Sequence, residues 1–301
     1  MSELIVKDNV LINASYSLDL IEQRLILLSI IEARESGKGI NEPLIIHADS
    51  YINQFKVHRT TAYQALKNAS KELFNRQFSY QETRGNNLIN ITSRWVSQIG
   101  YVENLAVIEL IFSPAVVPLI TKLEKHFTKY EFDQISDLSS AYAIRMYEIL
   151  ISWRSTGRTP IISLEVLKNR LGILEKKYTR IERFKKNIIE ASIIQVNKHT
   201  DIIATYTQHK EGRKIVGFSF NFSQKKIINN KIGVFPELTE SQIKKYSIIL
   251  SKLPDLADLS NFSSYYEFSK WISQILRNPN EYKRKISERV FKSLYYYTDF
   301  E

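Results

Sequence analysis

Residues 176–198 read KKYTRIERFKKNIIEASIIQVNK, and this stretch decides how the whole chain is interpreted. Its apolar residues recur at helical spacing and share one side of a helix: Ile181, Phe184, Ile188 and Ala191. Its basic and amide residues fall on the other side: Arg180, Arg183, Lys186 and Asn187. Taken alone, a basic face of this kind is most often the solvated side of an ordinary surface helix.

The elements expected around this helix change that interpretation. A short helix is expected at 164–171, and two strands are expected at 201–208 and 215–222 around the basic turn HKEGRK at 209–214. Helix, turn, helix and wing is an order in which the second helix enters the major groove of DNA. The sequence therefore predicts a winged-helix module whose long helix, 178–198, reads DNA.

A similar order of elements occurs earlier in the chain. Arg59 and Arg180 occupy matching places 121 residues apart, and the two short strands begin 116 residues apart. The first copy is expected as helix 17–35, strand 44–47, short helix 48–55, long helix 58–74 and a sheet over 78–112. The second copy adds helix 138–152 and strand 160–162 to the elements above. Recurrence in register indicates an internal duplication.

The predicted fold class is α+β and mainly helical, with two tandem winged-helix domains and a helical C-terminal tail. We expect the domains at 1–124, 125–233 and 234–301. A connecting helix is expected at 117–127. In the tail, Thr239 and Gln242 form a capping-box pattern ahead of an apolar run. The tail helices are expected at 239–253, 265–276 and 281–296.

Composition favours a nucleic-acid partner and gives little sign of catalysis. The net charge of +10 over 301 residues favours a polyanion. The absence of cysteine excludes thiol chemistry and suits a reducing cytoplasm. The N-terminal residues show no signal-peptide pattern, so we also expect a cytoplasmic location on that ground. The five histidines show no close metal-ligand spacing. We therefore expect no cofactor, no metal, no membrane span and no enzymatic activity.

The second module carries most of the candidate DNA contacts. Arg180 and Arg183 suit guanine, and Asn187 suits adenine. The residues better placed for phosphates are Lys177, Thr179, Lys210, Arg213 and Lys214. The full set for this module is Lys177, Thr179, Arg180, Arg183, Lys186, Asn187, Lys210, Arg213 and Lys214.

The first module is less basic and has two possible roles. Its candidate DNA contacts are His58, Arg59, Thr60, Tyr63, Lys67, Lys71 and, in its wing, Arg84. It could instead form a dimer, because its strand around 107–112 is strongly apolar. The alternative, favoured here, is that this strand belongs to the core.

Several stretches resemble theta-type plasmid replication initiators of the RepB type. They are NVLINASYSLDLIEQRLILLSIIEA at 9–33, LSSAYAIRMYEIL at 138–150, ISLEVLKNRLGI at 162–173 and YTRIERFKKNIIEASIIQVNKHTD at 178–201. The resemblance covers about residues 5–225 and leaves the tail outside it. It implies two tandem winged-helix domains that bind directly repeated origin sites, called iterons, mainly through helices near 58–71 and 177–190.

The same resemblance implies further partners. Monomers would open the origin and, with a host initiator, help load the host replicative helicase. Dimers formed through the first domain would bind an operator and repress the initiator's own gene. The alternatives are a winged-helix transcriptional repressor without initiator activity and a module that uses winged helices for protein contacts.

Overall fold

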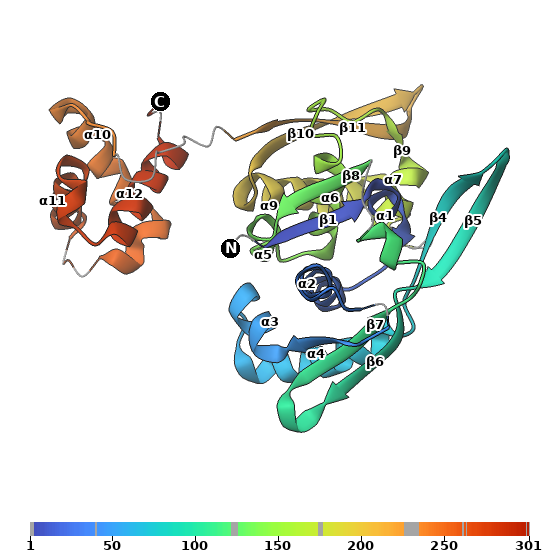
Figure 1. The fold of residues 1–301 in the computed structure, drawn as a ribbon. Coiled ribbons are helices and arrows are strands. Elements are labelled where there is room, and N and C mark those ends of the chain that lie inside the picture. The colour runs from blue at the N-terminus through green and yellow to red at the C-terminus, as the bar shows by residue number, and fades with distance from the viewer. Residues whose placement is uncertain are drawn as a thin grey trace. The chain divides into compact units, whose positions relative to one another are not determined.

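The computed structural model describes residues 3–39, 41–121, 126–173, 177–225, 235–260, 262, 264–298 and 300. The chain forms two compact units, Met1–Ile227 and Ile228–Glu301. The first unit holds two winged-helix modules (Figure 1). The two modules share one continuous hydrophobic core.

The first module combines three helices with a three-stranded antiparallel sheet. Its elements are α2 (Leu20–Ser36), β3 (Leu44–His47), α3 (Ala48–Phe55), α4 (Arg59–Leu73), β6 (Val96–Val102) and β7 (Val107–Phe112). The strand order is β3-β7-β6, so the apolar strand β7 lies in the middle of the sheet. Val107, Ile108, Leu110 and Phe112 are buried. The interpretation of this strand as core is therefore confirmed.

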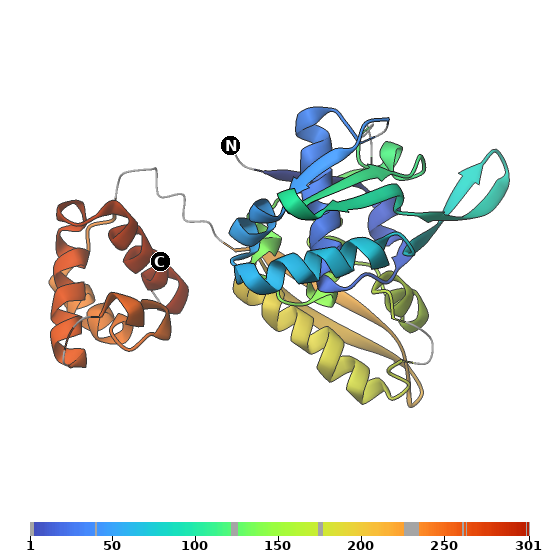
Figure 2. The same cartoon turned by 90° about the horizontal axis from the view of Figure 1, so that it is seen from below.

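A second hairpin follows the long helix of the first module. β4 (Gln77–Arg84) and β5 (Asn87–Arg94) form it, and β2 (Ser15–Tyr16) pairs with β4. The order β2-β4-β5 leaves β5 at the edge of its sheet. Figure 2 shows this hairpin projecting from the body of the first unit.

Segments from the two ends of the first module lie beside the second module. β1 (Leu4–Asp8) pairs with β8 (Phe127–Glu131), and α1 (Asn9–Asn13) and α5 (Asp133–Ser136) follow these strands. Helix α2 is buried on nearly every side from Glu22 to Ile31. An amphipathic surface helix would show one exposed face, so α2 acts as a central helix of the unit.

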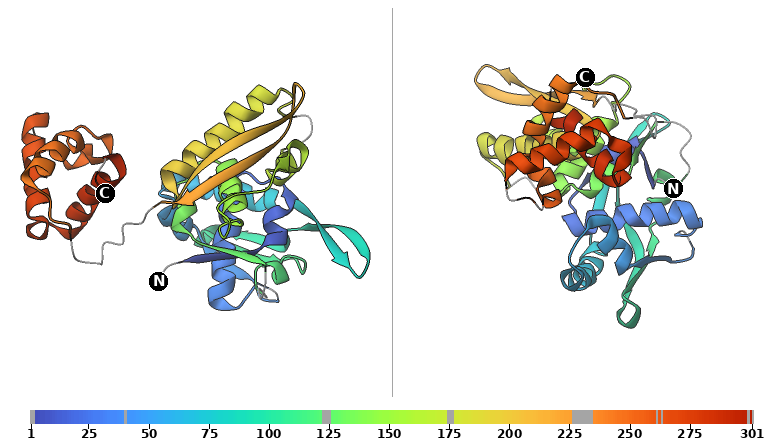
Figure 3. Two further views of the ribbon diagram at one scale, coloured as in Figure 1. Left: turned by 90° about the horizontal axis from the view of Figure 1, so that it is seen from above. Right: turned by 90° about the vertical axis from the view of Figure 1, so that its left-hand side faces the viewer.

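The second module repeats the same order of elements. They are α6 (Ala141–Ile151), β9 (Ile162–Ser163), α7 (Leu164–Arg170), α8 (Ile181–Phe184), a π-helical turn (Lys185–Glu190), α9 (Ala191–His199), β10 (Ile202–Glu211) and β11 (Lys214–Gln224). The strands pair in the order β10-β11-β9. Figure 3 shows the long helix of this module beside the β10–β11 hairpin.

The π-turn inside the long helix has a cause in the sequence. Buried side chains recur every four residues at Phe184, Ile188, Ser192 and Val196. An α-helix has about 3.6 residues per turn, so steps of four drift by about 40° each. The wider π-turn absorbs this drift. It thereby keeps the four side chains on the core face.

A buried polar cluster joins the N-terminal segment to the second module. Glu148 on α6 accepts hydrogen bonds from Lys7 Nζ (2.7 Å), Tyr130 Oη (2.6 Å) and Arg145 Nη1 (3.0 Å). Arg145 Nη2 also donates to the backbone oxygens of Ala14 (3.1 Å) and Arg170 (2.8 Å). Burial alone would raise the pKa of Glu148, but the charges of Lys7 and Arg145 hold it below its ordinary value.

The C-terminal unit has a core of its own. It contains α10 (Glu240–Leu250), α11 (Tyr265–Arg277) and α12 (Arg284–Tyr297), with 3-10 turns at Pro254–Leu259 and Pro279–Glu281. The predicted capping box is confirmed, because Thr239 and Gln242 satisfy each other's backbone N–H groups. Among the helices of the described residues, none has the length and apolar character needed to cross a bilayer.

Several expectations about secondary structure are wrong in detail. The connecting helix expected at 117–127 is a short 3-10 turn, Val117–Leu119, and β8 begins at Phe127; residues 122–125 lie outside the described ranges. The strand expected at 160–162 is Ile162–Ser163. The long helix begins at Ile181 rather than 178. The turn between the last two strands contains only residues 212–213.

Candidate nucleic-acid interface

The start of the long helix in the second module presents four candidate contacts to solvent. Arg180 is the N-cap of α8, Arg183 lies in its first turn, and Lys186 and Asn187 lie in the π-turn. All four are exposed, while Phe184 behind them is fully buried. The spacing of apolar residues therefore fixes which side of the helix faces outward.

The segment before this helix is held by a lysine that sequence reasoning did not select. Lys168 Nζ donates to the backbone oxygen of Tyr178 at 3.1 Å and lies 5.4 Å from the centre of the Phe184 ring. Tyr178 has a positive φ of 56°, which bends the chain ahead of the helix. Lys177 and Thr179, on either side of this bend, are exposed. They precede the helix instead of lying on it.

The wing of the second module carries three exposed cations at its tip. Lys210 lies near the end of β10, Arg213 in the two-residue turn and Lys214 at the start of β11. Gly212, also in the turn, has a φ of +59°, a value that glycine adopts without strain. The tight turn therefore gathers the three cations at one end of the hairpin.

Two hydrogen bonds fix the wing against the helix. Lys185 Nζ donates to Gln208 Oε1 at 3.2 Å, and Tyr206 Oη donates to Glu190 Oε1 at 2.7 Å. Partial burial and the neighbouring Glu190 raise the pKa of Tyr206 to about 12, so its hydroxyl stays protonated and able to donate. The helix and the hairpin thus form one continuous surface.

The side chains of the candidate contacts in the second module have no partners among the described residues. All nine are exposed, and in the part of the chain that the structure describes none of their side chains makes a hydrogen bond or an ion pair. Seven of them are lysine or arginine. A surface with this many unpaired cations attracts polyanions.

The candidate contacts of the first module differ, because carboxylates neutralise three of its cations. Arg59 pairs with Asp49, Lys67 with Glu103 and Arg84 with Glu82. The hydrogen bond from Arg59 holds the pKa of Asp49 below its ordinary value, so this carboxylate is ionised at neutral pH. His58, Thr60 and Lys71 are exposed, while Tyr63 and Lys67 are half-buried.

Sequence reasoning missed the acidic partners in the first module. Asp49 lies in the first turn of α3, and its side chain accepts a hydrogen bond from Arg59. The acid and the arginine are ten residues apart and lie on different helices. Only the turn between α3 and α4 brings them together, which a helical periodicity does not reveal.

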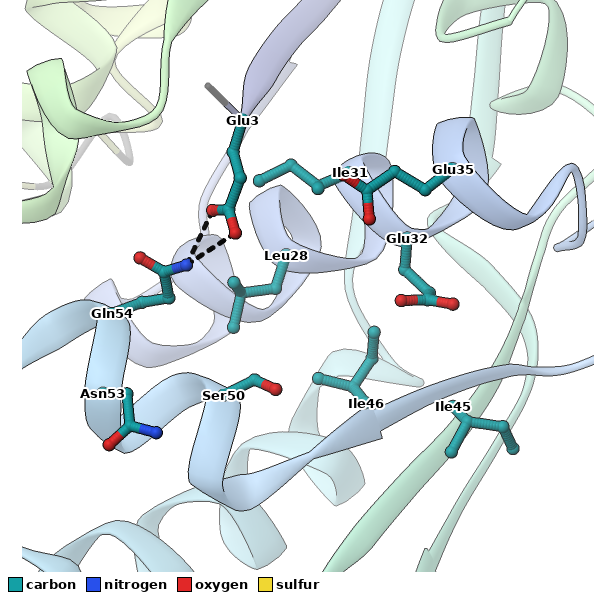
Figure 4. Close-up of a pocket in the computed structure, with 10 residues that line it drawn as sticks. All are labelled: Glu3, Leu28, Ile31, Glu32, Glu35, Ile45, Ile46, Ser50, Asn53 and Gln54. Carbon is teal, nitrogen blue, oxygen red and sulfur yellow. Dashed lines mark hydrogen bonds between the residues drawn. The ribbon is translucent and has the colours of Figure 1, made fainter. Parts of the chain in front are cut away.

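Another face of the first module is acidic and unsuited to DNA. Figure 4 shows Glu3, Glu32 and Glu35 around a cavity of about 310 Å³. Gln54 Nε2 donates to both carboxylate oxygens of Glu3 at 2.7 Å. Burial, and then the nearby charge of Glu35, raise the pKa of Glu3. This face would repel phosphates, so the candidate interface lies elsewhere.

Two winged-helix modules with a basic helix and wing define a nucleic-acid-binding class of protein. The family models for "Initiator Replication protein, WH1" and "Initiator Rep protein, WH2" match residues 4–151 and 163–222. The chain therefore belongs to the initiator replication protein family.

One curated relative and two solved structures are similar to this chain. A replication initiation protein of Escherichia coli is 24% identical over 254 residues, which are 81% of this chain and 76% of the relative. The crystal structure of Pi initiator protein in complex with iteron DNA matches with a TM-score of 0.60 at 22% identity, over 75% of this chain and 98% of that chain. The WH1 domain of MSBI1.176, a replication protein isolated from a multiple sclerosis patient, is 69% identical over 36% of this chain and 81% of that chain, with a TM-score of 0.32.

Proposed function

We propose that this protein initiates plasmid replication by binding iterons sequence-specifically. The observation that carries the proposal is the unpaired, exposed set of contacts on the helix and wing of the second module. The family assignment and the likeness to a structure that contains iteron DNA support the same function.

The two modules would contact successive major grooves, about 34–36 Å apart along the duplex. In this arrangement the second domain, 125–233, supplies the main iteron contacts, and the first domain, 1–124, adds further contacts and the dimer interface. The edge strand β5, with Leu88 exposed, is a surface through which the first domain could pair. The extension 234–301 lies outside the matched ranges.

As a monomer, the protein would promote opening of the origin and recruit the host helicase together with a host initiator. As a dimer, it would repress its own gene. These steps need no chemistry by the protein itself and no cofactor. They require only that binding energy on repeated sites be coupled to melting of adjacent DNA.

Replication of a test plasmid examines the proposal. A plasmid that carries this gene and its upstream tandem repeats, with no other origin, should be maintained in a suitable host. A matched plasmid that encodes Arg180→Ala and Arg183→Ala should be lost. Repression of a reporter by the protein without maintenance of the plasmid would support a repressor instead and contradict the proposal.

A further inference from the structure

Arg59 in the first module is held in place by two neighbours, although it lies at the surface. Its Nη2 donates to Asp49 Oδ1 at 2.8 Å, and its Nε donates to Tyr63 Oη at 2.9 Å. Tyr63 Oη also donates to Asp49 Oδ1 at 3.4 Å, which closes a three-membered network. Arg59 and Asp49 remain 65% and 58% exposed, so burial does not explain the arrangement.

The network sits where a winged helix meets base edges. Arg59 is the first residue of α4, and Tyr63 lies one turn later on the same helix. Asp49 belongs to α3, the preceding helix of the helix-turn-helix. N-terminal residues of the second helix are the ones that contact bases in this motif.

The bonding pattern leaves one edge of the guanidinium available. Nε and Nη2 together form the side edge, and Tyr63 and Asp49 occupy it. The end edge, made by Nη1 and the second hydrogen of Nη2, makes no hydrogen bond to any residue that the structure describes. Two parallel N–H groups on that edge match O6 and N7 of guanine.

Holding the side chain in advance also lowers the cost of ordering it. A free arginine side chain loses rotamer entropy when it is fixed. Asp49 is an unfavourable neighbour for phosphates, because its charge repels them. The Asp49 carboxylate would therefore lower the affinity for DNA of any sequence, and its useful effect is to orient Arg59.

The two modules differ in this respect. Arg180 and Arg183 in the second module have no partner among the described residues, whereas Arg59 and Lys67 in the first are each paired with a carboxylate. An arginine without a partner must be ordered when it binds a base edge, whereas Arg59 is already held in one orientation before DNA arrives.

We propose that Asp49 is a positioning residue that, with Tyr63, orients Arg59 to read guanine, so that the first module contributes sequence discrimination. This inference rests on the proposed function, since it requires a specific duplex site.

The test compares binding of the repeat duplex and of a random duplex of equal length, by fluorescence anisotropy at one salt concentration. Asp49→Ala should weaken binding to the repeat about tenfold while binding to the random duplex stays equal or tightens, because a negative charge is removed. Tyr63→Phe leaves the net charge unchanged and should likewise lower the ratio of the affinity for the repeat to the affinity for the random duplex. Asp49→Asn, which retains an acceptor, should restore part of the loss.

Glu72→Ala is the matched control, because Glu72 lies on the same helix, is exposed and bonds no arginine among the described residues. It removes the same charge and should leave the ratio of the two affinities unchanged. The guanine contact is tested by replacing each guanine of the repeat in turn with 7-deazaguanine, which lacks the N7 acceptor. At one position this replacement should weaken binding of the wild type but not of the Asp49→Ala variant.

The outcomes separate the two proposals. If Asp49→Ala tightens both duplexes equally, as Glu72→Ala should, the positioning role is wrong and the proposed function stands. If the wild type does not distinguish the repeat from random DNA, the proposed function fails and the positioning role fails with it. Thermal unfolding of each variant verifies that the fold is intact.

Discussion

At the residue scale, the candidate contacts of the second module fall into two groups: side chains that can recognise a base and side chains that can only bind phosphate. Arg183 projects from the first turn of α8, where a guanidinium can reach a base edge, whereas Lys214 lies at the tip of the wing, beside the expected path of the backbone. Arginine can make two hydrogen bonds to guanine, whereas a lysine on phosphate acts mainly as a point charge. Substitution of the two residues should therefore have different effects on binding to specific and random DNA.

Arg183→Ala should weaken binding to the repeat duplex by about 1–3 kcal/mol and change binding to random DNA little. Lys214→Ala should weaken both duplexes alike and reduce the salt slope by about one unit. Titrations at several salt concentrations measure both effects. Equal losses on the two duplexes for both variants would contradict this division.

Glu148 gives a prediction about pH. Its lowered pKa means that its stabilising contribution is complete above the ordinary value of 4.5 and is lost as pH falls below it. Glu148→Gln should cost about 3–5 kcal/mol at neutral pH, because it leaves buried Lys7 without its charge partner. Urea unfolding should show this cost shrinking toward acid pH. A cost that does not vary with pH would contradict the role of ionised Glu148.

At the element scale, the second module approaches the N-terminal segment closely at Gly172. It follows α7 with a φ of +69°, and an added Cβ would lie 2.0 Å from the backbone oxygen of Tyr16. Gly212 in the wing has a similar φ of +59°, but nothing lies within 4 Å of its added Cβ. The two glycines thus share a backbone requirement and differ in space.

Gly172→Ala should therefore be the more damaging change. Both variants should lose about 1–2 kcal/mol from left-handed strain, and Gly172→Ala should lose about 1–3 kcal/mol more because the backbone of β2 must move. Thermal and urea unfolding measure the difference. Equal losses for the two variants would show that the close approach is absent in solution.

The elements also show what the sequence could predict. Periodicity and turn residues located both long helices, because a buried stripe repeats regularly along each one: Ala62, Leu66, Ala69 and Leu73 in α4 are all buried, as expected. The π-turn escaped prediction, because the side chains it keeps in the core recur every four residues from Phe184 to Val196, which departs from α-helical spacing. Likewise, the pairing of β1 with β8 joins segments more than 100 residues apart, which no local pattern encodes.

The candidate site was predictable to a different degree in each module. Exposure follows from the apolar stripe, so the outward side of the second helix could be placed from the sequence. The acidic partners in the first module could not, because Asp49 and Glu103 reach α4 from other elements. These carboxylates neutralise cations on α4, so the candidate interface of the first module is less positive than that of the second. A count of basic residues alone does not show the full difference.

At the scale of the whole molecule, the two winged-helix modules of the first unit are joined by a polar cluster as well as by a common core. Arg145 on α6 bonds backbone oxygens of both the N-terminal segment and α7. Breaking such a buried network is costly. The modules are therefore expected to present their long helices as one body rather than as two independently tethered domains.

The most direct test of the account is a salt titration of the purified 301-residue protein on its own upstream repeats and on a random duplex. We predict tighter binding to the repeats at every salt concentration, with log Kd rising steeply with log salt at about 0.9 per phosphate neutralised. Alanine at Lys210, Arg213 and Lys214 together should flatten that slope without abolishing the preference. Identical affinity for the two duplexes, or a slope unchanged by the triple substitution, would contradict the account.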